Sequence, residues 1–245
     1  MNDNFKIYVC CHKDFELNLK NKVYEPIISK NINNDTWVNG LKGSFYSEIM
    51  SYFYIAENYE LLDYIGFCQY RRHWSFEDNV PNVEDMFKQA EVFVIRPFEL
   101  EGNTYGQYDF YHNVEDLKIA ADIVINKFLD YENALLSFLN GKYIFPYNMF
   151  IMKKEDFLRY INFIKTILDE YLNVVGLDIE KRIKDNEDKY FKHIEELPQN
   201  DTLEYQYRIG GYLAERLTNI FIIKNFNTIG AFDVNIIEEK YGFMA

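Results

Sequence analysis

The fold class is decided by residues 63–74, which read Asp-Tyr-Ile-Gly-Phe-Cys-Gln-Tyr-Arg-Arg-His-Trp. The first part of this stretch, from Asp63 to Tyr70, is nearly continuous in apolar residues. That pattern is typical of a strand covered on both faces of a sheet, as in α/β proteins. Three cationic or titratable side chains follow the strand without a gap, at Arg71, Arg72 and His73.

Strand-like and helix-like segments alternate on both sides of this stretch. Three further strands are predicted at residues 5–11, 91–95 and 147–153. Helices are predicted at residues 45–58, 83–89, 131–139, 154–172 and 203–224, with one more beginning at Val114 behind the cap Asn113. Residues 18–43 and 98–112 are polar and predicted as loops, residues 178–200 are charged and left unassigned, and a short strand or coil closes the chain. The alternation predicts an α/β fold with a mixed, mostly parallel sheet flanked by helices, which binds ligands beyond the carboxyl ends of its strands.

Length and charge narrow the class of protein further. A chain of 245 residues suits one domain, and residues 1–245 are predicted to form a single one. The 26 basic and 39 acidic residues give a net charge of −13, which argues against a general nucleic-acid binder. The three cysteines do not form a disulfide framework, and no stretch is apolar enough to span a membrane, so we expect a cytoplasmic protein.

Common catalytic motifs are missing from the sequence. It has neither the glycine-rich dinucleotide loop nor the Walker phosphate loop, and it lacks the nucleophile elbow of serine hydrolases. No spaced pairs of cysteine or histidine indicate zinc. A phosphate-binding role therefore falls to the arginines after the central strand, because a guanidinium binds phosphate oxygens in a bidentate fork. The alternative is that Arg71 and Arg72 form structural ion pairs.

Two other segments carry polar side chains in a pattern. The predicted C-terminal helix places Arg208, Tyr212, Glu215 and Asn219 on one face, at i, i+4, i+7 and i+11. In the predicted loop, Tyr105, Tyr108 and Tyr111 could stack on a sugar or a base, or could equally cover a core.

Four separated motifs resemble one family. The central stretch resembles the signature Ile-Gly-Leu-Cys-His-Tyr-Arg-Arg-Tyr of a bacterial polysaccharide-synthesis family catalogued as domain of unknown function 4422. The resemblance spans nearly the whole chain. It includes residues 6–13, Ser47-Glu48, residues 148–154, Arg208 and residues 211–217. This sequence departs from the pattern at Gln69, where a histidine is usual, and at His73 and Trp74, where an aromatic pair is usual.

The resemblance implies a glycosyltransferase of GT-A-like fold that uses a nucleotide-sugar donor. Transfer of galactose or galactofuranose from a UDP-sugar to a saccharide acceptor in cell-surface polysaccharide synthesis is favoured, with inversion at the anomeric carbon. The acceptor would be lipid-linked, and membrane contact would be at most peripheral. Enzymes of this fold normally hold Mn²⁺ or Mg²⁺ through an Asp-x-Asp motif, which is absent after the hydrophobic strands here. We therefore predict no protein metal site and expect arginines to stabilise the leaving diphosphate instead.

Roles for individual residues follow from the same resemblance. Glu215 is the first choice for the base that takes the acceptor proton, with Glu48 and Asp109 as the other two. The donor is expected to contact Cys11, His12, Lys13, Gln69, Tyr70, Arg71, Arg72 and His73. The acceptor is expected to contact Asn148, Met149, Arg208 and Tyr212.

Two other functions remain open. A nucleotide-sugar or glycan-binding module without turnover is the main alternative, because the Asp-x-Asp motif and the usual histidine are absent. A sugar nucleotidyltransferase ranks last, because no glycine-rich loop follows Cys11.

Overall fold

The computed structural model describes residues 2–12, 21–29, 32, 43–76 and 79–237. The strands are β1 (Phe5–Cys11), β2 (Tyr24–Ile28), β3 (Tyr64–Gln69), β4 (Arg72–Trp74), β5 (Val92–Ile95), β6 (Phe98–Glu99), β7 (Tyr143–Ile144), β8 (Phe150–Lys153), β9 (Ile229–Phe232) and β10 (Val234–Ile236). The helices are α1 (Gly43–Tyr46), α2 (Ile49–Asn58), α3 (Val83–Phe87), α4 (Thr104–Tyr111), α5 (Val114–Lys127), α6 (Glu132–Asn140), α7 (Lys154–Val175), α8 (Ile179–Lys184), α9 (Glu187–Tyr190), α10 (Leu203–Gln206) and α11 (Ile209–Asn225). Short 3₁₀ turns lie at Leu129–Tyr131 and Pro198–Asp201.

The central sheet is mixed, as predicted. Strands β2, β1 and β3 run parallel to one another, and β9 runs parallel to β5. Strand β8 lies between β3 and β5 and is antiparallel to both, while β4 and β10 extend the sheet as antiparallel strands beyond β3. Strands β6 and β7 form a separate two-stranded sheet.

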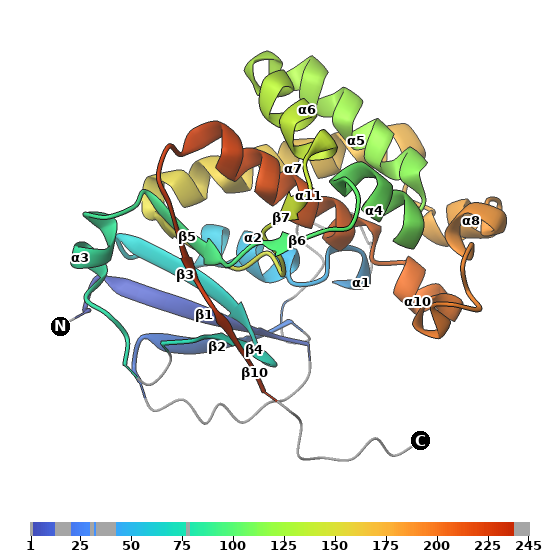
Figure 1. Ribbon diagram of the computed structural model, residues 1–245. Coiled ribbons are helices and arrows are strands. Elements are labelled where there is room, and N and C mark those ends of the chain that lie inside the picture. The colour runs from blue at the N-terminus through green and yellow to red at the C-terminus, as the bar shows by residue number, and fades with distance from the viewer. Residues whose placement is uncertain (1, 13–20, 30–31, 33–42, 77–78, 238–245) are drawn as a thin grey trace.

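Alternation along β1 shows how the sheet buries both faces. Tyr8 and Cys10 belong to the larger core cluster, whereas Ile7 and Val9 belong to the other. The larger core lies under most of the helices, which gather over one face of the sheet (Figure 1). The smaller core includes Trp74 and Met86 and is covered by α3 and the C-terminal strands. A strand with apolar side chains on both faces needs both cores, which explains why β1 is apolar except at Lys6.

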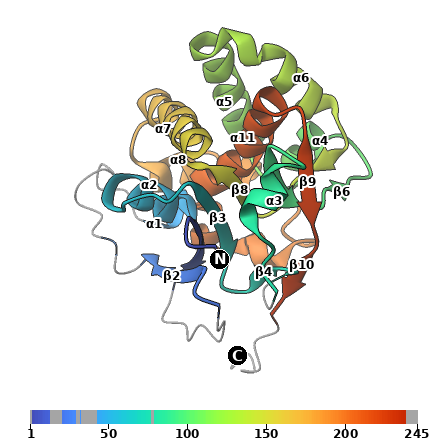
Figure 2. The same cartoon turned by 90° about the vertical axis from the view of Figure 1, so that its left-hand side faces the viewer.

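The C-terminal strands close the sheet. Strand β9 pairs with β5 at one edge, and β10 pairs with β4 at the other. In Figure 2 the two strands follow one another on the side of the molecule away from α2.

The structure corrects several sequence predictions. The loop predicted at residues 18–43 contains β2, and the loop predicted at residues 98–112 contains β6 and α4. The single helix predicted over residues 45–58 is broken between α1 and α2, where Ser47 has a φ of 51°. The helix predicted over residues 203–224 is likewise divided into α10 and α11. Strands β1, β3 and β5 and helices α3, α5, α6 and α7 confirm the remaining predictions to within a few residues, and β8 is shorter than predicted.

Candidate active site

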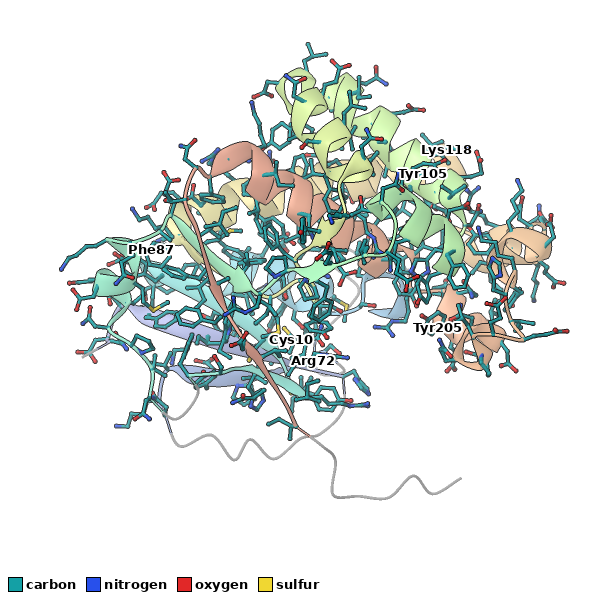
Figure 3. The ribbon with its side chains drawn as sticks, viewed as in Figure 1. Cys10, Arg72, Phe87, Tyr105, Lys118 and Tyr205 are labelled. Carbon is teal, nitrogen blue, oxygen red and sulfur yellow. The ribbon has the colours of Figure 1, made fainter. Side chains whose placement is uncertain are left out.

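A polar cavity of about 310 Å³ lies between the end of β3 and the helix α11. The sheet side contributes Ser47, Glu48, Gln69, Arg72, Tyr147 and Asn148. The helical side contributes Gln107, Tyr111, His112, Tyr205, Arg208, Gly211, Tyr212, Glu215 and Arg216. Figure 3 labels one residue from each side, Arg72 at the sheet and Tyr205 on α10.

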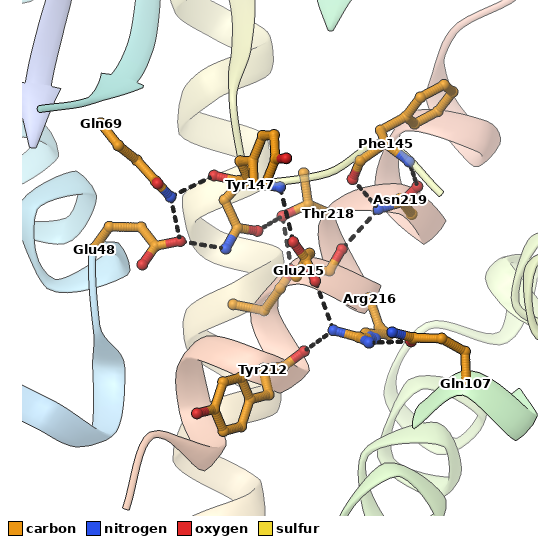
Figure 4. Close-up of polar contacts among 12 residues, drawn as sticks. Glu48, Gln69, Gln107, Phe145, Tyr147, Tyr212, Glu215, Arg216, Thr218 and Asn219 are labelled. Atoms are coloured by element: carbon orange, nitrogen blue, oxygen red, sulfur yellow. Dashed lines mark hydrogen bonds and ion pairs between the residues drawn. The ribbon is translucent and has the colours of Figure 1, made fainter. Parts of the chain in front are cut away.

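Glu48 lies at the break between α1 and α2 and is held by neutral donors. Its Oε1 accepts a hydrogen bond of 2.9 Å from Asn148 Nδ2 and a longer one of 3.4 Å from Gln69 Nε2 (Figure 4). Burial raises the pKa of the Glu48 carboxyl above its ordinary value, and the Asn148 hydrogen bond and the charge of Arg208 offset only part of this effect. A carboxylate with a raised pKa in a cavity is suited to accepting a proton.

The backbone around Glu48 is strained. Ser47, Tyr147 and Asn148 have φ values of 51°, 72° and 56°, in the left-handed region that non-glycine residues seldom adopt. All three residues line the cavity. Such strain persists only where surrounding contacts impose it, and it concentrates at functional sites.

Side chains of α11 impose the turn at residues 147–148. Glu215 Oε1 accepts a 2.8 Å hydrogen bond from the Tyr147 backbone N–H, and Thr218 Oγ1 donates to Asn148 Oδ1 at 2.9 Å. One turn beyond Glu215, the Asn219 side chain donates a hydrogen bond to the Phe145 backbone oxygen and accepts one from the Phe145 N–H. The helix therefore fixes the loop that presents Asn148 to Glu48.

Glu215 makes a different set of contacts from Glu48. Its Oε2 pairs with the Arg216 guanidinium at 2.6 Å, while its Oε1 is engaged by the loop backbone. Arg216 is only 2% exposed and also donates to the side chain of Gln107. A buried guanidinium needs a carboxylate partner, so Glu215 has a structural task.

Two glycines let α11 approach the break between α1 and α2. A Cβ atom added at Gly210 would lie 2.8 Å from the Phe45 carbonyl oxygen, and one at Gly211 would lie 2.6 Å from Ser47 Oγ. Any larger residue at either position would push α11 away from Ser47, and hence from Glu48.

Arginines give the cavity a cationic side. Arg72 donates to Gln69 Oε1 at 2.7 Å, and its guanidinium lies 4.4 Å from the centre of the Tyr147 ring. Arg208 is exposed and donates to Ser47 Oγ at 3.0 Å. Neither guanidinium has an ion pair with a carboxylate among the contacts found in the described part of the chain. Both can therefore bind an anionic ligand without first losing a carboxylate partner.

Aromatic rings form part of the cavity wall. The Tyr212 ring stacks on His112 with centroids 3.9 Å apart. His112 is buried, and burial, aided by the positive charge of Arg216, holds the pKa of its imidazole well below the usual value. The ring is therefore neutral at pH 7 and acts as an apolar surface as well as a polar group.

Comparison with known protein families identifies the family of this chain. The sequence model of a domain of unknown function, DUF4422, matches residues 6–226. The chain belongs to the DUF4422 family. No curated protein matches it.

A solved structure has the same fold as this DUF4422 chain. It is the apo structure of the bifunctional glycosyltransferase WbbM, with a TM-score of 0.75 and 21% sequence identity. The match covers 96% of this chain but 45% of WbbM, so the DUF4422 chain spans less than half the length of that protein. At this identity the match establishes the fold, which is that of a part of a glycosyltransferase.

About half of the predicted site residues meet at the cavity of the DUF4422 chain. Those that line it are Glu48, Gln69, Arg72, Asn148, Arg208, Tyr212 and Glu215. They come from four separate parts of the sequence, and residues of the central stretch and of the C-terminal helix line the same cavity.

The other predicted site residues lie elsewhere. Cys11, Tyr70, His73 and Met149 are buried in or beside the smaller core, and burial raises the pKa of the Cys11 thiol to about 11. The four remaining predicted residues are Asp109, Arg71, His12 and Lys13.

Each of these four has its own surroundings. Asp109 forms an ion pair with Lys192 at 2.5 Å, and Arg71 Nε donates to the Tyr70 hydroxyl at 2.6 Å. His12 is exposed beside Tyr70, and Lys13 lies outside the described residues.

Apart from Tyr111, seven residues that line the cavity were not predicted as site residues, namely Ser47, Gln107, His112, Tyr147, Tyr205, Gly211 and Arg216. The adjacent glycines at 210 and 211 were the available signal for Ser47, because they mark a close approach to another backbone. No signal marked Gln107, since it lies in a segment predicted as a loop. Of the three tyrosines that could stack on a sugar or cover a core, Tyr111 lines the cavity and Tyr108 is buried.

Within the described residues, no group of three or more histidine, cysteine, aspartate or glutamate side chains could hold a metal ion. Over those residues, no helix is both long enough and apolar enough to cross a bilayer.

Proposed function

We propose that this chain is a glycosyltransferase that moves a sugar from a UDP-sugar donor to a saccharide acceptor. The observation that carries the proposal is Glu48, a carboxyl group of raised pKa in a cavity that Arg72 and Arg208 also line, within the fold of a glycosyltransferase. The family resemblance favours galactose or galactofuranose as the sugar, in the synthesis of a cell-surface polysaccharide. It also favours a lipid-linked acceptor that the protein reaches by peripheral contact with the membrane.

In this proposal Glu48 replaces Glu215 as the first choice of base. Glu48 Oε1 is held by two neutral amides, whereas Glu215 neutralises a buried guanidinium. The Glu48 carboxylate takes the proton of an acceptor hydroxyl, whose oxygen then attacks the anomeric carbon of the donor. The bond from that carbon to the phosphate oxygen breaks, and the nucleoside diphosphate leaves with the electron pair. Attack from the face opposite the leaving group inverts the anomeric configuration.

Arg72 and Arg208 are the proposed partners of the diphosphate. Each presents a guanidinium at the cavity, and fixed cations stabilise negative charge that develops on a leaving group. The sequence favoured Arg71 beside Arg72, but Arg71 does not line the cavity and Arg208 does. The carboxylates here, Glu48 and Glu215, are engaged by amide, backbone and guanidinium donors and do not fit a resident metal ion, so no step is assigned to one.

Calorimetric titration of UDP tests the donor site. The protein is titrated once with Mn²⁺ and once with EDTA, and Arg72→Ala is compared with Arg71→Ala as the matched control. We expect equal binding in both buffers, weakened at least tenfold by Arg72→Ala and little changed by Arg71→Ala. Binding that requires Mn²⁺, or that depends on Arg71 alone, would contradict the proposed site.

Product formation separates the enzyme from a binding module. UDP-galactose and UDP-galactofuranose are incubated with saccharide acceptors, and the products are examined by mass spectrometry. A new glycoside together with released UDP supports the transferase. UDP-sugar binding without any product would favour the non-catalytic module.

A further inference from the structure

A continuous run of aromatic rings leads from the cavity to the protein surface. Each ring contacts the next in the order Tyr205, Tyr212, His112, Tyr111, Phe110 and His193. We call these six residues the ring strip. They come from α4, α10, α11 and the segment after α9, so the strip is assembled by the fold and not by one sequence motif.

The inner half of the strip belongs to the cavity wall. Tyr205 and Tyr111 are partly exposed there, on either side of the stacked pair formed by Tyr212 and His112. The centroids of Tyr205 and Tyr212 lie 5.6 Å apart, and the Tyr212 hydroxyl donates to the Tyr205 backbone oxygen at 2.8 Å. This hydrogen bond fixes the position of Tyr205 relative to α11.

The outer half of the strip is open to solvent. The rings of Phe110 and His193 are stacked with centroids 4.4 Å apart and an interplanar angle of 19°. Phe110 is 37% exposed, and so is the side chain of His193. The ion pair between Lys192 and Asp109 ties the His193 segment to α4. His193 itself has a φ of 66°, an unfavourable conformation that these contacts maintain.

The charge of the outer half indicates the kind of ligand. Lys192 is paired with Asp109, and Glu196 lies 3.5 Å from His193, so this region has no excess positive charge for a phosphate. The proposed diphosphate partners, Arg72 and Arg208, lie in the cavity instead. Rings with adjacent polar groups suit a neutral sugar chain. The C–H bonds of a pyranose face pack on the negative face of an aromatic ring, while its hydroxyls reach side chains at the edges.

We propose that the ring strip is an acceptor subsite, which binds an oligosaccharide whose terminal sugar lies beside Glu48. The orientation of the chain rests on the proposed transferase activity, whereas the binding of sugar units along the strip does not. Because the strip runs beyond the cavity, it favours an acceptor of several sugar units over a single sugar. Tyrosine and phenylalanine suit this role, since their rigid rings lose little conformational entropy on binding.

Variants that remove rings but keep the fold test the subsite. Phe110→Leu keeps an apolar side chain, and His193→Asn keeps a residue that tolerates the left-handed backbone. Tyr143→Ala removes an exposed ring on β7 outside the strip and serves as the control. Unchanged melting temperatures would show that all three variants fold.

The binding experiment uses an array of bacterial surface-polysaccharide fragments of one to six sugar units. We expect the unmodified protein to bind longer fragments more tightly than single sugars, and each strip variant to weaken that binding about five- to tenfold. The control should bind as the unmodified protein does. Absence of length-dependent binding, or equal binding by the strip variants, would overturn the subsite.

Kinetic measurements distinguish the subsite from the activity on which its orientation rests. In a transfer assay, Phe110→Leu and His193→Asn should raise KM for an oligosaccharide acceptor with little change in kcat or in KM for the donor. Ring-dependent binding without any transfer would refute the transferase but keep a glycan-binding strip. Transfer with a KM that is independent of both rings would refute the strip alone.

Discussion

The side-chain amide of Asn148 donates a 2.9 Å hydrogen bond to Glu48 Oε1 across 100 residues of sequence. Both ends of this bond lie at unusual backbone, since Ser47 precedes Glu48 in a left-handed conformation and Asn148 is itself left-handed. The bond joins the break between α1 and α2 to the loop before β8. The position of the proposed base thus depends on two distant segments at once.

Substitution of the two cavity carboxylates should separate their roles. Glu48→Gln keeps the shape of the side chain but cannot accept a proton, so kcat should fall on the order of 10²- to 10⁴-fold with unchanged UDP binding. Glu215→Gln should chiefly lower the melting temperature, because it leaves Arg216 buried without its carboxylate. Steady-state kinetics and thermal unfolding measure both effects. An active Glu48→Gln enzyme would remove Glu48 from the mechanism.

The dependence of rate on pH should reflect the environment of Glu48. A base acts only when ionised, so kcat/KM should fall as the pH drops through its pKa. Because burial raises that pKa, the fall should occur above pH 4.3, where an ordinary glutamate titrates. Asn148→Ala removes a hydrogen bond that favours the ionised form, so it should move the acidic limb to higher pH. A limb that stays in place or moves down would contradict the assignment.

Thr218 should influence catalysis without contacting the cavity. Its hydroxyl shares its one hydrogen between Asn148 Oδ1 at 2.9 Å and the Ala214 carbonyl oxygen at 2.7 Å, and the contact with Oδ1 leaves the Asn148 NH₂ group pointing at Glu48. Thr218→Val should lower stability by about 1–3 kcal/mol through an unsatisfied buried oxygen, and it should also lower kcat. Thr218→Ser should restore kcat, because it returns the hydroxyl. If Thr218→Val destabilises the protein but keeps the kcat and pH profile of the unmodified enzyme, Thr218 has a structural role only.

A buried carboxylate holds the region of α8 and α9 in place. Asp116 is 1% exposed and accepts hydrogen bonds from Tyr171, Tyr190 and Arg182. Asp116→Asn should destabilise the protein by about 3–5 kcal/mol, because it leaves a partly buried guanidinium without its counter-charge. Asp233→Asn is the matched control, because it breaks an ion pair in which the Asp233 side chain is 67% exposed, and it should cost less than about 1 kcal/mol. Similar losses in urea unfolding would contradict this difference.

The strands that the sequence predicted well are those whose own residues indicate burial on both faces of the sheet. Strands β1, β3 and β5 are apolar on both faces, and this pattern has few other interpretations. Strand β2 was missed because it contains Pro26 and Glu25 and, among the described strands, pairs with β1 alone. Proline is tolerated at the edge of a sheet, but in a sequence it argues against a strand.

The broken helices could not be predicted from local pattern. Residues 45–58 have helical spacing throughout, yet Ser47 leaves the helix where Gly211 approaches it. The cause lies more than a hundred and fifty residues away in the sequence. Interactions of this kind override local helix preference.

The sequence singled out segments that meet at the cavity, but it did not indicate which side chains within each segment face the cavity. Arg71 and Arg72 are adjacent and chemically identical, and only the tight connection between β3 and β4 directs Arg72 into the cavity. The two glutamates were likewise indistinguishable until their partners were known. Glu215 pairs with Arg216, a neighbour whose burial no local pattern indicated.

The dependence of the cavity on α11 has a consequence during protein synthesis. Glu48, Gln69 and Asn148 leave the ribosome before Gly211, Glu215 and Thr218, because Gly211 follows Asn148 by 63 residues. Until then the turn at residues 147–148 lacks its contacts with Glu215 and Thr218, and the cavity lacks the wall that α11 provides. A nascent chain can therefore contain every residue of the sheet side and still lack the site, which forms when α11 docks.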